Sequence, residues 1–195
     1  MDGLAVRKIV LMALKSTWGP TRDQRTLAAY EKYPDRVIPF IGLNGVSPIS
    51  RDVLEYVDGQ LANGKFRGLG ELLSRHYGFS TETGAGTSVE AGDYTIPMDS
   101  PGVQDLMCLA AKHNVVLIVH METTAVTIQA LERALQRNPA TKVIWAHQTH
   151  IKTLDGSTAQ HARKADPEQI ANLLDKYPNL YADMPISLRA SSRVI

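Results

Sequence analysis

Two kinds of hydrophobic pattern alternate along the chain. Short, nearly continuous apolar segments rich in β-branched residues predict strands, and segments with apolar residues every three or four positions predict amphipathic helices. Six strands are predicted, at residues 6–14, 36–43, 65–73, 115–120, 142–147 and 179–184. Polar segments with helical periodicity fall between them, so the chain reads as a regular alternation of strand and helix.

The predicted helices carry recognisable start and stop signals. Ser50 is placed to cap the second helix, and Gly64 is placed to end it. Pro101 stands at the first turn of the third helix, where its missing N–H costs nothing. Five helices are predicted, at about residues 23–33, 50–64, 101–114, 128–138 and 166–177.

Alternating strands and helices with apolar strands predict a parallel sheet covered by helices. Both a doubly wound sheet and a TIM barrel satisfy this pattern, but no glycine-rich nucleotide-binding loop follows the first strand. The long connections, 73–98 and 148–165, both follow the C-terminal ends of strands, as they do in a (β/α) barrel. The predicted fold class is therefore α/β, a partial (β/α) TIM-type barrel of about six parallel strands with outer helices, forming one domain over residues 1–195.

Composition narrows the function classes. The chain has 195 residues, is 44% hydrophobic and has a formal net charge of +1, so neither nucleic acid nor an anionic membrane is an expected partner. A lone cysteine, Cys108, fits a reducing compartment. No apolar run is long enough to cross a bilayer, and the N-terminus lacks the features of a signal peptide. These observations predict a cytoplasmic protein.

Two predicted strands end on histidine, His120 and His147, and Glu71 ends a third. Active sites of parallel α/β folds lie at the C-terminal ends of the strands. Imidazole and carboxylate are ordinary ligands of zinc and similar divalent ions. The alternative is structural: either histidine fits a hydrogen-bonded core position, and Glu71 fits an ion pair with Arg67 or Arg75.

Other polar residues allow a functional and a structural interpretation. His150 is close enough to the fifth strand to serve as a further ligand, and a surface position explains it equally well. Asp183 ends the sixth strand, where it is placed either to contact substrate or simply to be solvated. Trp145 shares the strand parity of His147, so it either fills or blocks the barrel interior. His76 lines a pocket or is solvated, and His113 suits a helix C-terminus.

Four segments carry a family resemblance: FRGLGELLSRH, GVQDLMCLAAKHNVVLIVHME, ALERALQRNPATKVIWAHQTH and LLDKYPNLYADM. In order and spacing they resemble the amidohydrolase superfamily, specifically its amidohydrolase-related TIM-barrel branch, over about residues 35–190. The resemblance implies a divalent-metal hydrolase, in some branches a decarboxylase, in which metal-activated water attacks a carbonyl-type carbon. It implies that His120 and His147 bind the metal, with zinc the expected ion, and that Glu71 binds or bridges it.

The sequence also departs from that family. It has no His-x-His or His-x-Asp pair and ends at SLRASSRVI, before a last strand with the family's aspartate. We therefore expect a truncated six-strand arc whose open edges, 6–14 and 179–184, favour self-association, and whose hydrolytic turnover is very low. If turnover is robust instead, Asp183 or His150 is the first candidate for the catalytic group. The alternatives are a metal-dependent decarboxylase on the same scaffold and a non-catalytic α/β interaction module.

Overall fold

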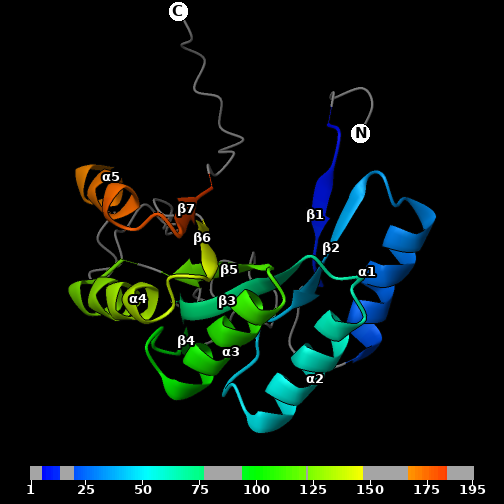
Figure 1. Cartoon of the computed structure of the whole chain (residues 1–195), viewed down its shortest axis with the longest axis horizontal. Coiled ribbons are helices and arrows are strands. Elements are labelled where there is room, and N and C mark those ends of the chain that lie inside the picture. Colours follow the sequence, from blue (N-terminus) through cyan, green and yellow to red (C-terminus); the bar gives the residue numbers. More distant parts are fainter. Residues whose placement is uncertain (1–5, 14–19, 77–93, 122, 147–166, 184–195) are drawn as a thin grey trace, which may run out of the picture.

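The computed structural model describes residues 6–13, 20–76, 94–121, 123–146 and 167–183. Within these ranges six parallel strands form one open sheet in the order β1-β2-β3-β5-β6-β7 (Figure 1). Their bounds are β1 Ile9–Leu11, β2 Val37–Gly42, β3 Gly68–His76, β5 Val116–Met121, β6 Lys142–Ala146 and β7 Leu180–Ala182. The predicted fold class, a partial parallel α/β barrel, is confirmed.

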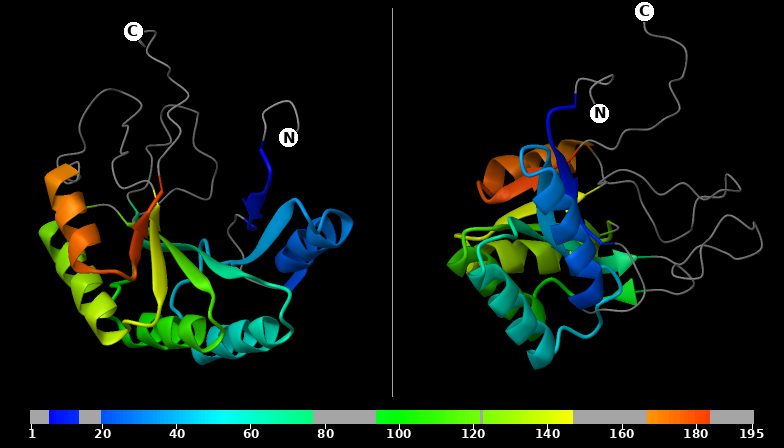
Figure 2. Two further views of the ribbon diagram at one scale, coloured as in Figure 1. Left: turned by 45° about the horizontal axis from the view of Figure 1, so that its top comes forward. Right: turned by 90° about the vertical axis from the view of Figure 1, so that its right-hand side faces the viewer.

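Five helices connect the strands and wrap one side of the curved sheet, as the left view of Figure 2 shows. Their bounds are α1 Pro20–Lys32, α2 Arg51–Ala62, α3 Pro101–Lys112, α4 Ala125–Arg137 and α5 Pro167–Lys176. No helix in the described ranges is both long and apolar enough to cross a lipid bilayer. We call the side of the sheet that faces away from the helices the concave side.

Helix ends follow the local sequence signals closely. Ser50 caps α2 and accepts a hydrogen bond from the backbone N–H of Val53 at 3.4 Å. Gly64 adopts a φ of +68°, which glycine tolerates without strain, just beyond the end of the same helix. A reciprocal capping box between Thr124 and Thr127 starts α4 and was not predicted.

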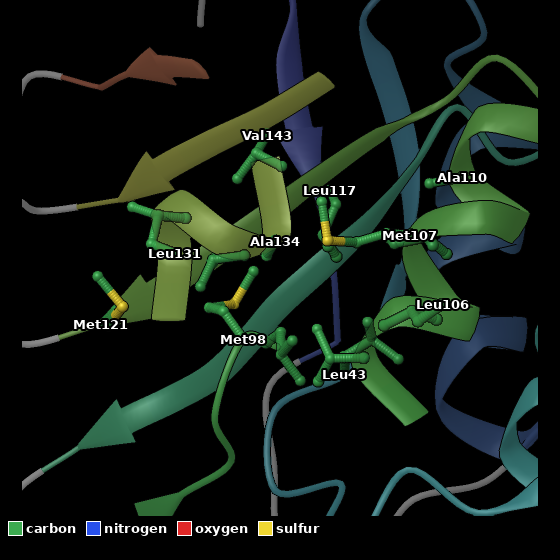
Figure 3. Packing of buried hydrophobic residues seen from close by; sticks show 14 of the residues in the cluster. Leu43, Met98, Leu106, Met107, Ala110, Leu117, Met121, Leu131, Ala134 and Val143 are labelled. Carbon is green, nitrogen blue, oxygen red and sulfur yellow. The ribbon is translucent and has the colours of Figure 1, made fainter. Parts of the chain in front are cut away.

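The hydrophobic core lies between the sheet and the helices (Figure 3). The strands contribute fully buried side chains such as Leu117, and Met98 and Met107 fill the space between elements. Trp145 also belongs to this core, and its indole N–H donates a hydrogen bond to the carbonyl of Met121 at 3.0 Å. Trp145 therefore lies on the helix side and neither fills nor blocks the concave side.

Residues of β5 alternate between the two sides of the sheet. Leu117, Val119 and Met121 are buried in the core, whereas Ile118 and His120 are only partly buried. A strand turns successive side chains to opposite faces, so this second set lies on the concave side. The concave side of β5 thus carries one of the predicted metal ligands.

The first strand differs most from its prediction. Only Ile9–Leu11 forms β1, although residues 6–14 were predicted as one strand, and Ile9 and Val10 are 36% and 43% exposed. In the described part of the chain β1 pairs with β2 alone, so one of its sides has no neighbouring strand. Among the strands of the described residues, β1 and β7 are the two edges of the sheet, as the sequence predicted for the first and last strands.

The segment 73–98, predicted as an irregular loop, contains additional strand structure at both ends. β3 continues to His76, and a short strand, β4 (Tyr94–Thr95), pairs with it antiparallel. The Ile96 backbone N–H donates to the Ser74 carbonyl at 2.7 Å, and the Ser74 hydroxyl donates to the carbonyl of Ile96 at 2.8 Å. Because this pairing is only two residues long, the apolar pattern of the sequence did not reveal it.

Candidate functional site

An extra residue in β3 decides which side of the sheet its acidic side chain reaches. At Leu69 and again at Leu72, β3 is in register with β5, but Gly70 and Glu71 together lie opposite the single residue Ile118. This is a β-bulge, which re-aims the side chains that follow it. Leu69 and Leu72 both remain in the core, and Glu71 is turned to the concave side.

Gly70 allows the bulge to form because the two strands approach each other closely there. Its φ is +150°, and a Cβ added to it would lie 2.7 Å from the Cβ of Ile118 and 3.0 Å from the Ile118 carbonyl oxygen. A side chain at this position would therefore be strained by both its backbone conformation and its contacts.

Glu71 and His120 meet across the two neighbouring strands. The Glu71 Oε1 atom lies 3.4 Å from the His120 Nδ1 atom, and the two side chains are only 15% and 17% exposed. Oε1 itself is shielded from solvent. We call these two residues the Glu–His pair. It joins two of the three residues that the sequence predicted to bind metal.

The separation within the Glu–His pair is informative. A charge-assisted hydrogen bond between nitrogen and a carboxylate oxygen is typically about 2.7–2.9 Å long. Two ligand atoms each about 2.0–2.2 Å from one tetrahedral zinc ion stand about 3.3–3.6 Å apart. The observed 3.4 Å matches the second arrangement, so the pair fits two corners of a tetrahedral metal site. The described residues contain no group of three or more potential metal ligands.

The remaining predicted site residues have different outcomes. His147 and His150 lie outside the described residues, as does the side chain of His76. Asp183 directly follows β7, is partly buried, and its backbone N–H lies 3.4 Å from the carbonyl of Trp145. Glu71 was predicted at the end of its strand but lies within β3, because pairing with β5 and β4 extends that strand to His76.

His113 lies away from this site, on the outer helices. It caps the C-terminus of α3, and its Nε2 atom is 2.6 Å from Asp58 Oδ1 on α2. Lys112 binds the same carboxylate, and the hydrogen bonds from His113 and Lys112 hold the pKa of Asp58 below its usual range. The helix-end position was predicted, whereas the partner Asp58 was not.

A buried carboxylate near the C-terminal end of β2 was missed entirely. Asp23 of α1 is 4% exposed; its Oδ1 accepts the backbone N–H of Gly42 at 3.0 Å, and its Oδ2 accepts the Tyr56 hydroxyl at 2.7 Å. Burial, with Asp23 as the second cause, raises the pKa of Tyr56 above its ordinary value. In the sequence, Asp23 looks like an ordinary acidic residue in a first helical turn.

The fold and the Glu–His pair define a partial-barrel α/β protein with a carboxylate–imidazole site on its concave side. The amidohydrolase family model matches residues 14–193, and the chain belongs to this family. Members of the family are generally metal-dependent and act on small molecules. No curated protein matches the sequence significantly.

Two solved structures match this chain at low sequence identity. A dihydroorotase from Campylobacter jejuni is 16% identical, with a TM-score of 0.44, over 84% of this chain and 39% of that chain. A 2,6-dihydroxybenzoate decarboxylase from Rhizobium is 14% identical, with a TM-score of 0.49, over 93% of this chain and 66% of that chain. The chain thus spans less than two thirds of the length of either protein, and its family assignment rests on the sequence match.

Proposed function

We propose that this chain is a metal-dependent hydrolase of the amidohydrolase type that acts on a small carbonyl-containing substrate. The observation that carries the proposal is the Glu–His pair, a carboxylate and an imidazole 3.4 Å apart on the concave side of a sheet from this family. Both groups are largely buried, which favours electrostatic interactions with a bound cation.

In this proposal His120 and Glu71 are metal ligands, His147 is the third, and zinc is the expected ion. Because His147 shares the strand parity of Trp145, this role requires the chain to leave regular strand geometry after Ala146. Imidazole nitrogen and carboxylate oxygen suit zinc, which also accepts three protein ligands with one open position. When bound, such an ion supplies Lewis acidity, which polarises a carbonyl group and makes water a stronger acid. Glu71 and His120 are largely buried on neighbouring strands, which restricts the movement of the carboxylate and the imidazole.

Hydrolysis also needs a group that accepts a proton from water. Asp183 is the first candidate among the described residues, because it directly follows β7. Side chains alternate along a strand, so Asp183 is expected on the same side as Tyr181. Tyr181 lies opposite Ile144 of β6. His150 is the second candidate. A decarboxylase on the same scaffold would use the same ligands, and release of carbon dioxide distinguishes it from a hydrolase.

Metal binding by three single variants tests the proposal. Each purified protein is stripped with a chelator and titrated with zinc. His120→Ala and Glu71→Gln should each weaken zinc binding at least about tenfold, as even loss of a group outside the ligand shell commonly does. His113→Ala is the matched control, because this histidine binds Asp58 on the outer helices.

The proposed metal site would be contradicted if the wild-type chain takes up no zinc, or if His120→Ala and Glu71→Gln both bind zinc as tightly as the wild type. Retained affinity in the variants would also favour the alternative of a non-catalytic interaction module. Turnover is measured separately on amide, ester and lactone substrates with zinc restored, and turnover that persists after chelation would exclude a metal-dependent reaction.

A further inference from the structure

Asp23 is a buried carboxylate with no part in the proposed metal site. Removing a charged group from water is costly unless hydrogen bonds compensate for the lost hydration. Here both oxygen atoms accept hydrogen bonds from groups distant in sequence, the Gly42 amide on β2 and the Tyr56 hydroxyl on α2. The carboxylate thus fixes the end of β2 relative to two helices.

The end of β2 is connected to the Glu–His pair by one further hydrogen bond. Gly42 lies opposite Gly70 in the sheet, and the next residue, Leu43, donates its backbone N–H to the Gly70 carbonyl at 3.1 Å. That carbonyl belongs to the same planar peptide unit as the nitrogen and Cα of Glu71. The orientation of this peptide unit therefore determines the position of the Glu71 Cα atom, from which the side chain extends.

Gly42 cannot position itself through a side chain. A Cβ there would lie 2.4 Å from the carbonyl oxygen of Ala13, so the site has room only for glycine. Its backbone is held by pairing with β3 and by the hydrogen bond from the Gly42 N–H to Asp23.

We propose that Asp23 is a positioning residue for the Glu–His pair. It holds Gly42, and through Leu43 and the Gly70 carbonyl it keeps the bulge of β3 in the orientation that turns Glu71 toward His120. The inference rests on the proposed function in treating this pair as the reactive centre, but the contact between Glu71 and His120 can be measured without any metal.

The test uses nitrogen-15 NMR of the His120 imidazole in the metal-free protein at one fixed pH. Glu71→Gln defines the shifts of an imidazole that has lost its carboxylate neighbour. Asp23→Ala should move the His120 shifts most of the way toward those values. Asp23→Asn keeps an oxygen acceptor for the Gly42 amide and should stay close to wild type.

Two further variants separate positioning from general stability. Tyr56→Phe removes the link to α2 but leaves the Gly42 contact, so its His120 shifts should resemble wild type. Glu132→Ala removes a polar contact between α4 and α5, where Glu132 binds Lys176 and Tyr177, and should also leave them unchanged. If Asp23→Ala does not fold, the double variant Asp23→Leu/Tyr56→Phe replaces both polar partners with apolar groups and takes its place.

The inference is overturned if His120 keeps its wild-type shifts in folded Asp23→Ala or in the double variant. It is also overturned if Glu71→Gln leaves those shifts unchanged, because the contact to be positioned would then be absent. Zinc titration of the same proteins reports the proposed function separately. A wild-type chain without zinc affinity but with the expected shifts would refute the metal site and leave the positioning role intact, whereas an affinity loss of about tenfold in Asp23→Ala would support both.

Discussion

Replacing Gly70 by alanine tests the bulge that creates the Glu–His pair. The added Cβ would lie 2.7 Å from the Cβ of Ile118 and 3.0 Å from its carbonyl oxygen, and both atoms belong to or adjoin the rigid backbone of β5. Overpacking of this kind costs about 1–3 kcal/mol. The φ of +150° adds about 1–3 kcal/mol for a residue with a side chain. We expect Gly70→Ala to lower the free energy of unfolding by about 2–6 kcal/mol.

Urea unfolding followed by circular dichroism measures this loss. With a denaturant slope of about 2 kcal/mol per molar, the midpoint should fall by about 1–3 M. Gly59→Ala is the matched control, since Gly59 lies within α2 and an added Cβ meets no atom within 4 Å. There the same substitution should raise the free energy of unfolding by about 1 kcal/mol, because alanine is the better helix former.

An unchanged midpoint for Gly70→Ala would refute the reasoning, provided that Gly59→Ala shifts in the expected direction. It would mean that the strands are not held as closely as the contacts imply, and that Glu71 reaches the concave side in another way. If the variant instead loses stability as expected, its zinc affinity should also fall, even in buffer without urea, since Gly70 precedes Glu71 directly.

Three further predictions address the core, an ion pair and an edge. Leu117→Ala should lower the free energy of unfolding by about 2–5 kcal/mol in urea titrations, because Leu117 is fully buried, whereas Val126→Ala, at a site 72% exposed, should change it little. Hydrogen bonds, chiefly from Lys176, lower the pKa of Glu132, so this carboxylate stabilises the fold above its unfolded pKa and ceases to do so as the pH falls through the folded value. Glu132→Gln should therefore cost up to about 1 kcal/mol at pH 7 and nothing once the carboxylate of the wild type is protonated; equal costs at both pH values would exclude the ion pair as the cause. Val10→Lys, on the exposed edge strand β1, should reduce any concentration-dependent light scattering of the wild type, and unaltered scattering would show that this edge does not mediate association.

Those features of the fold that depend on local sequence could be predicted. Runs of β-branched residues gave six parallel strands in the correct order along the chain, and the Ser50 cap and Pro101 marked helix starts where the structure has them. The edge position of β1 followed from the number of predicted strands and not from its own residues. Its apolar sequence is typical of a central strand, but exposure depends on how many neighbours the strand has, which is a property of the whole sheet.

The candidate site was only partly accessible from sequence. The sequence placed His120 at the end of its strand, and the structure has it in β5, where regular alternation puts it on the concave side. The role of Asp23 depends on contacts with Gly42 and Tyr56, which are 19 and 33 positions away, and no local pattern links these three residues. His147 and His150 remain predictions.

Glu71 reaches the concave side only because β3 contains a bulge, which the alternation of residues in the sequence does not predict. In a regular strand Leu69 and Glu71 would face the same side, which would put a carboxylate into the core opposite Val119. Burying that charge without a partner would cost more than the local disruption of a bulge. The extra residue at Gly70 resolves the conflict: Leu72 takes the core position, and Glu71 turns toward His120. Regular strand alternation is broken at one point, next to the acidic residue of the Glu–His pair. Such local departures from the rules are expected at functional sites.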